Sequence, residues 1–109
     1  MAALYSVQYP GRAGLGSGAM YVGNGAMAGF DIYGGRYKAS YREAGGRISA
    51  TGTLSMPDGG RLVTGQDVPP KTNVRLAIDW PSDLGAGNAL ELKILGQLVR
   101  VAFYKMVEF

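Results

Sequence analysis

The sequence predicts an all-β fold, an eight-stranded antiparallel up-and-down barrel, and three observations support this prediction. Eighteen glycines divide the chain at short intervals, the segments between them alternate apolar and polar residues, and no segment has a helical period. Eight sequential strands with one apolar face must bury that face, either in a closed barrel or in a sandwich, and we expect the barrel. With 109 residues, 47% of them hydrophobic, the chain is expected to form one domain.

Eight segments carry the alternating pattern. The only long irregular stretch, 57–72, contains Pro57-Asp58-Gly59-Gly60 and Pro69-Pro70. Since proline cannot donate a backbone hydrogen bond to a sheet, we expect this stretch to cover one end of the barrel. The expected strands are 4–9, 18–23, 26–33, 36–43, 47–56, 73–80, 89–95 and 98–108.

Glycine-containing turns set the expected strand register, because a two-residue turn determines which residues face each other. The expected turns are Asn24-Gly25, Gly34-Gly35, Gly45-Gly46 and Gly96-Gln97. The expected inner face then carries Ala19, Tyr21, Ala28, Phe30, Ile32, Tyr37, Ala39, Tyr41, Ala50, Gly52, Leu54, Val74, Leu76, Ile78, Trp80, Leu90, Leu92, Ile94, Val99, Val101 and Phe103.

The composition argues against catalysis and against cofactor or metal chemistry. The chain has no Cys and no His, the residues that most often bind zinc, act as thiol nucleophiles or transfer protons near neutral pH. We therefore expect no enzyme activity, no catalytic residue, no metal and no cofactor. The N-terminus has no leader pattern and no apolar run reaches membrane-spanning length, so we expect a cytoplasmic protein that binds no membrane. A net charge of +3 is too small to indicate direct nucleic-acid binding.

The first half of the chain resembles the GrlR-like family of small bacterial regulators of type III secretion. The likeness lies in the order and spacing of several short motifs. These are Leu4-Tyr5-Ser6, Gly16-Ser17-Gly18, Gly23-Asn24-Gly25, Gly29-Phe30-Asp31 and Tyr33-Gly34-Gly35-Arg36-Tyr37. The resemblance implies a calycin-like barrel that forms a homodimer and represses transcription by binding a transcriptional activator, without contacting DNA itself.

The turn between the fourth and fifth expected strands departs from this family. The best-known member presents an acidic cluster there for its activator, whereas this chain has Arg42-Glu43-Ala44-Gly45-Gly46-Arg47. One Glu43 between two arginines cannot reproduce a run of carboxylates. We expect Arg42, Glu43 and Arg47 to form a partner-binding turn, with either a different partner or a different docking surface.

Aromatic residues on the expected inner face are the candidate ligand site. Tyr21, Tyr37, Tyr41 and Trp80 face small residues there, which leaves two interpretations open. The side chains pack a closed core, or they line a pocket for a small apolar molecule or lipid. The second interpretation makes the protein a calycin-like carrier or sensor instead of an adaptor.

Apolar residues on the expected outer face are the candidate dimer or partner interface. They come from the second and third strands and from the last strand, and they contrast with the ordinary case of scattered exposed apolar residues. The interface candidates are Met20, Val22, Met27, Leu98, Ala102, Tyr104 and Met106.

Other patterns favour structural roles. A basic surface near Tyr33 superficially suggests nucleic-acid binding; it comprises Arg36, Lys38, Arg42 and Arg47. With a single aromatic and a small charge excess, we expect a solvated strand face instead. Asp31 is then opposite Lys38 in an exposed ion pair. The Gly-x-Gly units lack the helix and lysine of a phosphate loop, so turns explain them better. Convergence of the three carboxylates Asp67, Asp79 and Asp83 on one site stays open.

Overall fold

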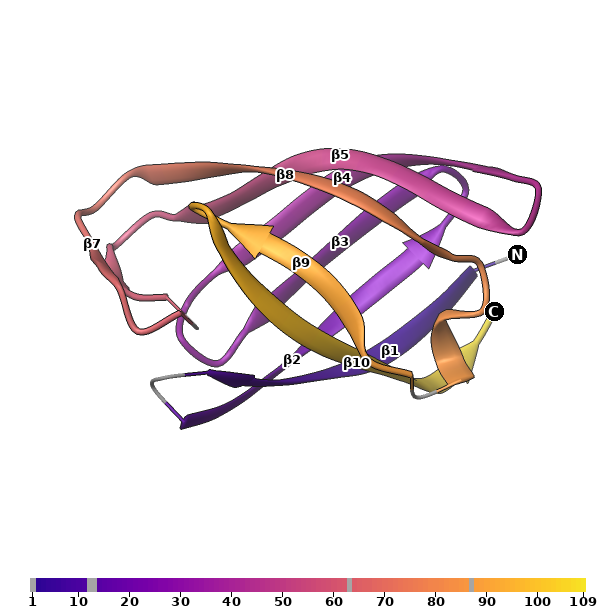
Figure 1. Cartoon of the computed structure of the whole chain (residues 1–109), viewed down its shortest axis with the longest axis horizontal. Helices are drawn as coiled ribbons and strands as arrows, with labels where there is room; N and C mark the ends of the chain where they lie inside the picture. The colour runs from indigo at the N-terminus through magenta and orange to yellow at the C-terminus, as the bar shows by residue number, and fades with distance from the viewer. Residues whose placement is uncertain (1, 12–13, 63, 87) are drawn as a thin grey trace.

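The chain folds as one antiparallel meander that curls into a nearly closed barrel (Figure 1). The computed structural model describes residues 2–11, 14–62, 64–86 and 88–109. Eight strands hydrogen-bond in the order β8-β5-β4-β3-β2-β1-β10-β9, so the predicted up-and-down barrel is confirmed. The strands are β1 Ala2–Gly11, β2 Gly14–Gly23, β3 Ala26–Asp31, β4 Arg36–Ala44, β5 Arg47–Met56, β8 Thr72–Pro81, β9 Leu90–Ile94 and β10 Gln97–Glu108.

Two predicted turns are confirmed, and a third lies one residue earlier than predicted. Asn24-Gly25 and Gly45-Gly46 have the positive φ angles that two-residue hairpin turns require. The β9–β10 turn is Leu95-Gly96 instead of Gly96-Gln97, so Leu92 faces Val99. The predicted register is thus wrong by two residues. A shift of two leaves every side chain on the same face, and the residues expected inside on both strands are buried.

The β3–β4 connection differs more strongly from the prediction. The Gly34-Gly35 turn was expected to place Phe30 opposite Ala39, but Phe30 is opposite Arg36. This shift of three residues moves the side chains of β3 to the other face. Met27 is only 3% exposed in the core, whereas Phe30 is 61% exposed and Ile32 is 62% exposed. The strand also ends at Asp31 and not at Tyr33.

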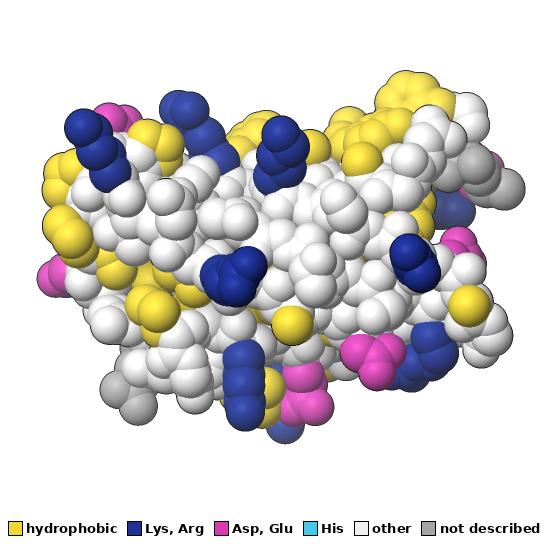
Figure 2. All heavy atoms as spheres, turned by 90° about the horizontal axis from the view of Figure 1, so that it is seen from above, with side chains coloured by type: hydrophobic (Ala, Val, Ile, Leu, Met, Phe, Trp, Pro, Cys, Tyr) yellow, Lys and Arg dark blue, Asp and Glu magenta, His cyan; other side chains and the backbone are white. Residues whose placement is uncertain are grey.

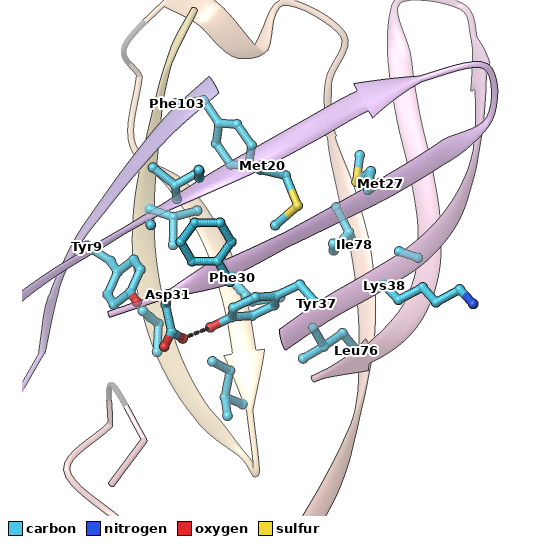
Figure 3. Close-up of a pocket in the computed structure, with 18 of the residues that line it drawn as sticks. Tyr9, Met20, Met27, Phe30, Asp31, Tyr37, Lys38, Leu76, Ile78 and Phe103 are labelled. Carbon is cyan, nitrogen blue, oxygen red and sulfur yellow. Dashed lines mark hydrogen bonds between the residues drawn. The ribbon is translucent and has the colours of Figure 1, made fainter. Parts of the chain in front are cut away.

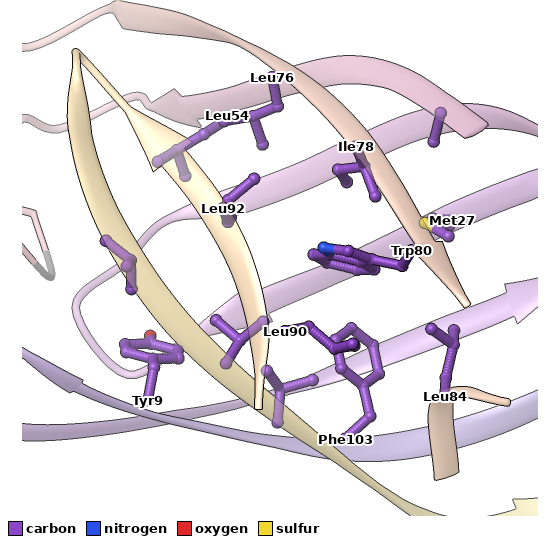
Figure 4. Close-up of a cluster of buried hydrophobic side chains, with 14 of the residues drawn as sticks. Tyr9, Met27, Leu54, Leu76, Ile78, Trp80, Leu84, Leu90, Leu92 and Phe103 are labelled. Atoms are coloured by element: carbon purple, nitrogen blue, oxygen red, sulfur yellow. The ribbon is translucent and has the colours of Figure 1, made fainter. Parts of the chain in front are cut away.

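The barrel interior is packed with aliphatic and aromatic side chains (Figure 4). Phe103 makes edge-on ring contacts with Tyr5 at 5.5 Å and with Trp80 at 5.4 Å between ring centroids. Alternation along β8 and β9 buries every second residue, as the sequence predicts for a sheet with one apolar face. The interior is therefore a core that holds the strands in one register.

Trp80 joins the two ends of the sheet. Strands β8 and β9 are the edges of the hydrogen-bonded order, yet they lie close together. The indole Nε1 of Trp80 donates a hydrogen bond to the carbonyl oxygen of Glu91 at 2.8 Å. Because the ring is buried, one side chain both fills the core and bridges the seam between these strands.

The stretch 57–72 is less irregular than predicted. It contains a small hairpin of β6 Gly60–Arg61 and β7 Asp67–Val68, closed by an ion pair between Arg61 and Asp67. Leu62 and Thr64 within it are buried. A single 3-10 turn, Leu84–Ala86, lies between β8 and β9. Within the described ranges, no helix is long and apolar enough to cross a membrane.

The β3–β4 register predicts unequal effects of truncating two apolar residues of similar size. Met27→Ala removes buried methylene groups and is expected to lower the free energy of unfolding by about 2–5 kcal/mol. Ile32→Ala, at an exposed position, is expected to change it by no more than about 0.5 kcal/mol. Urea unfolding of both variants measures the difference, and a larger loss for Ile32→Ala would contradict the register.

Candidate functional site

A buried carboxylate organises the connection between β3 and β4. Asp31 is 7% exposed, and its Oδ1 accepts hydrogen bonds from the backbone N–H groups of Tyr33 and Gly35, both at 2.9 Å. Its Oδ2 accepts the hydroxyl of Tyr37 at 2.6 Å. A Cβ at Gly35 would lie 2.6 Å from Oδ2, so the carboxylate fits only because this residue is glycine. Asp31 is therefore buried and opposite Gly18, not the exposed partner of Lys38 that was expected.

Two tyrosines surround this carboxylate (Figure 3). Burial raises the pKa of Tyr37 far above its ordinary value of 10.0, and the charge of Asp31 raises it further. The pKa of Tyr9 is also raised, mainly by burial and then by the charge of Asp31. The Tyr9 hydroxyl also donates to the carbonyl oxygen of Ser17 at 3.5 Å. Both phenols therefore stay protonated and act as hydrogen-bond donors at neutral pH.

The Tyr9, Asp31 and Tyr37 side chains line one part of a small cavity whose other walls are mostly apolar. The cavity lies inside the barrel between β1–β4 and β8–β10 and has a volume of about 50 Å³. An enclosed water molecule needs about 10–15 Å³ of such volume, and pockets for drug-sized ligands have roughly 300–1,000 Å³. The space thus suits a few small atoms near Asp31 and is much too small for a lipid chain.

The four predicted pocket residues do not converge on this cavity. Tyr37 and Trp80 line it, whereas Tyr21 and Tyr41 are absent from its walls. Tyr21 lies on the outer side of β2, with its ring 6.3 Å from that of Phe109. Its expected inward position was wrong because Val22 is buried and Met20 packs against the core, which gives β2 the opposite parity. The alternating pattern did not predict that Tyr9 and Asp31 line the cavity. An Asp three residues before Gly-Gly, as in Asp31 to Gly35, is nevertheless a typical loop signal.

The predicted outer patch on β2 and β3 is also wrong. Val22 and Met27 are buried in the core, and Met20 packs against it and lines the cavity. These residues point inward because β2 and β3 have the opposite parity to the predicted one, and the same parity places Tyr21 and Phe30 outside. They therefore form no exposed interface on this chain.

The outer side of β1, β2 and β3 is instead a continuous surface without charge. The outward residues are small, polar without charge, or apolar, and strand pairing connects them in rows: Val107 faces Leu4 and Leu4 faces Tyr21. In the next row Ser6 lies between Tyr104 and Ala19, which faces Phe30. We call this surface the uncharged face. It consists of Ala2, Leu4, Ser6, Gln8, Ser17, Ala19, Tyr21, Ala26, Ala28, Phe30, Tyr104, Val107 and Phe109.

The last strand extends this surface, as the sequence suggested. Tyr104 and Met106 are exposed, and the bulge opposite Leu4 and Tyr5 leaves Met106 without a partner residue on β1. Ala102 is half-buried and Leu98 is exposed nearer the start of the strand. The outward position of these residues is confirmed, while their role as an interface stays a prediction.

The other side of the barrel is basic and hydroxyl-rich (Figure 2). The predicted partner-binding turn lies at its edge, where Arg47 donates to Asp79 at 3.1–3.2 Å in an exposed ion pair. Alternation places Arg42 on this outer side and Glu43 on the opposite side of β4. Arg42 and Arg47 therefore lie on the basic outer side, whereas Glu43 does not.

The three carboxylates left open by the sequence do not form a common site. Asp67 pairs with Arg61 and Asp79 pairs with Arg47, while Asp83 is exposed beyond the end of β8. Among the residues that the structure describes, no group of three acidic, His or Cys residues is arranged to hold a metal ion.

Removing the Asp31 carboxylate is predicted to destabilise the fold. Asp31→Ala leaves two backbone donors and one phenol without acceptors in a buried place, and we expect the free energy of unfolding to fall by about 2–4 kcal/mol. The control is Asp58→Ala in an exposed turn, which is expected to change it by about 0.5 kcal/mol or less. Equal losses in the two variants, measured by urea unfolding, would refute the structural role of Asp31.

The raised pKa of Tyr37 predicts a loss of stability in alkali. Above about pH 10 the unfolded chain loses a tyrosine proton that folded Tyr37 retains, so the folded state binds more protons and the free energy of unfolding falls as pH rises. In Tyr37→Phe this decline is expected to be shallower, whereas Tyr104→Phe, at an exposed position, is expected to keep the slope of the unchanged chain. Unfolding curves from pH 9 upward test this, and identical slopes for all three proteins would contradict it.

Comparison of the chain with protein-family models, curated proteins and solved structures gives no match. The resemblance to the GrlR-like family therefore stays a prediction.

Proposed function

We propose that this chain is a small, non-catalytic regulatory adaptor that acts by binding proteins and forms a homodimer through the uncharged face. The observation that supports this most is the continuous surface over β1, β2, β3 and the end of β10. Between Ala2 and Phe30 the only charged residue of the sequence is Arg12, which lies outside the described residues. Surfaces depleted of charge and enriched in aromatic residues are typical of the centres of protein interfaces.

A second copy of this chain is the occupant that suits this surface. Phe109 is 72% exposed, and together with Phe30, Tyr104 and Val107 it exposes apolar area that a partner would cover. Two copies with a net charge of +3 repel each other through their basic sides. Contact centred on the outer sides of β1 and β2 keeps most of the cations on these basic sides apart. Arg36 and Lys38, which are opposite Phe30 and Ala28, then lie at the rim of the interface.

The regulatory part of the proposal comes from the sequence resemblance. It implies a protein that binds a transcriptional activator and thereby represses secretion genes, with no direct contact with nucleic acid. The cytoplasmic location and the lack of a cofactor in this proposal come from the composition and the N-terminal pattern instead. The dimer leaves the outer sides of β5 and β8 accessible to a protein partner, while Arg36 and Lys38 on β4 border the dimer face. The alternative, a carrier of small apolar molecules, is supported less well because the cavity is small.

The dimer is tested by placing a charge at the centre of the uncharged face. Ser6 lies between Tyr104 and Ala19, so Ser6→Glu brings one carboxylate from each copy into the proposed interface. We expect the unchanged chain to have the mass of a dimer and Ser6→Glu the mass of a monomer in sedimentation equilibrium.

The matched control is Thr51→Glu, at an exposed position of β5 on the basic side. It is expected to remain dimeric. A monomeric unchanged chain, or a dimer that Thr51→Glu dissociates and Ser6→Glu does not, would refute this assignment of the face.

A further inference from the structure

The positive excess of this chain is concentrated on one side of the barrel. The outward residues of β4, β5 and β8 include five cations and one carboxylate, Asp79. The remaining chain has six cations and seven carboxylates, so this side alone carries more than the whole positive excess. We call it the basic face. Its outward residues are Arg36, Lys38, Ser40, Arg42, Ala44, Arg47, Ser49, Thr51, Thr53, Ser55, Asn73, Arg75, Ala77, Asp79 and Pro81.

Four of the five cations have no acidic partner within the part of the chain that the structure describes. Arg47 is bonded to Asp79, whereas Arg36, Lys38, Arg42 and Arg75 form no ion pair there. The expected neutralisation of Lys38 by Asp31 does not occur, because Lys38 faces Ala28 and Asp31 is buried. The structure thus removes one reason for treating this face as an ordinary solvated surface.

Strand pairing brings three of these cations around one site. Lys38 faces Thr53, and Thr53 faces Arg75, so the two cations flank a hydroxyl at a separation of about 10 Å between their Cα atoms. Arg36 is two residues from Lys38 on the same side of β4, about 7 Å away. Along an extended peptide, every second side chain is also about 7 Å from the next on its face.

From this arrangement we propose that the basic face binds an extended acidic polypeptide segment, whose Asp or Glu side chains contact Arg36, Lys38 and Arg75 and whose polar groups bond to Ser and Thr hydroxyls. The inference rests on the proposed adaptor function, since it gives the chemistry of the protein partner. Nucleic acid suits the face less well, because none of its outward residues is aromatic, and the neighbouring exposed ring of Phe30, opposite Arg36, belongs to the uncharged face. Tyr37, Tyr41 and Trp80 on the same strands point inward.

The test uses the full chain and a fluorescein-labelled peptide of alternating Glu and Ser, followed by fluorescence anisotropy. The peptide is expected to bind at low ionic strength and to bind more weakly as salt is added. The double variant Lys38→Glu/Arg75→Glu is expected to weaken binding about tenfold or more. A second variant, Lys38→Gln/Arg75→Gln, is expected to weaken it less, and it covers the case in which charge reversal impairs folding.

The matched control is Arg100→Glu, an exposed cation on β10 away from the basic face, which is expected to leave peptide binding unchanged. Absence of binding at low salt, or equal weakening by Arg100→Glu, would overturn the proposal. A single-stranded DNA of equal charge that binds as tightly and loses affinity in the same double variant would also overturn it. Ser6→Glu distinguishes the two proposals: it is expected to bind the peptide as a monomer, so loss of the dimer and loss of peptide binding are separate results.

Discussion

The buried carboxylate of Asp31 is the constraint on which the surfaces of this protein depend. A carboxylate in the core needs hydrogen-bond donors, and the loop after β3 supplies two backbone N–H groups while β4 supplies the Tyr37 hydroxyl. Meeting this need requires a longer connection than a two-residue turn. The longer connection changes the β3–β4 register by three residues from the register that a Gly34-Gly35 turn would give. Because this number is odd, the change reverses which side of β3 faces the core.

The three hairpins with two-residue turns show how far the sequence predicts the fold. Asn24-Gly25 and Gly45-Gly46 determine their registers because both residues adopt positive φ, and the error of two at Leu95-Gly96 leaves the faces unchanged. At Gly34-Gly35 the same dipeptide signal fails, because the turn begins earlier, with the Gly34 N–H donating to the Asp31 carbonyl oxygen, while Gly35 allows close approach of the Asp31 carboxylate. Nothing in β3 itself corrected the error, since both of its faces carry apolar residues: Met27 on one and Phe30 on the other.

That ambiguity explains why the candidate sites were predicted unevenly. The aliphatic interior of β8, β9 and β10 follows from strict alternation, and so does the outward position of Tyr104. The uncharged face depends on the parity of β2 and β3, which pattern alone assigned to the wrong side. The isolation of Lys38 from any carboxylate depends on the same parity, because only a buried Asp31 leaves it without a partner.

The two faces together describe a barrel that separates its contacts by chemistry. Apolar and uncharged residues gather on the outer side of β1, β2 and β3, while cations and hydroxyls gather on the outer side of β4, β5 and β8, and the core fills the interior. The interior carries stability, since its cavity is small and its polar cluster holds a loop. We propose that the exterior carries function, through a second copy on one side and an acidic polypeptide on the other.

The β3–β4 register is the claim on which both faces rest, and backbone nuclear Overhauser effects measure it most directly. The structure predicts contacts between Met27 and Ala39 and between Gly29 and Tyr37. Contacts that instead connect Phe30 with Ala39 and Ile32 with Tyr37 would contradict the account, because Phe30 would then belong to the core and Met27 to the surface.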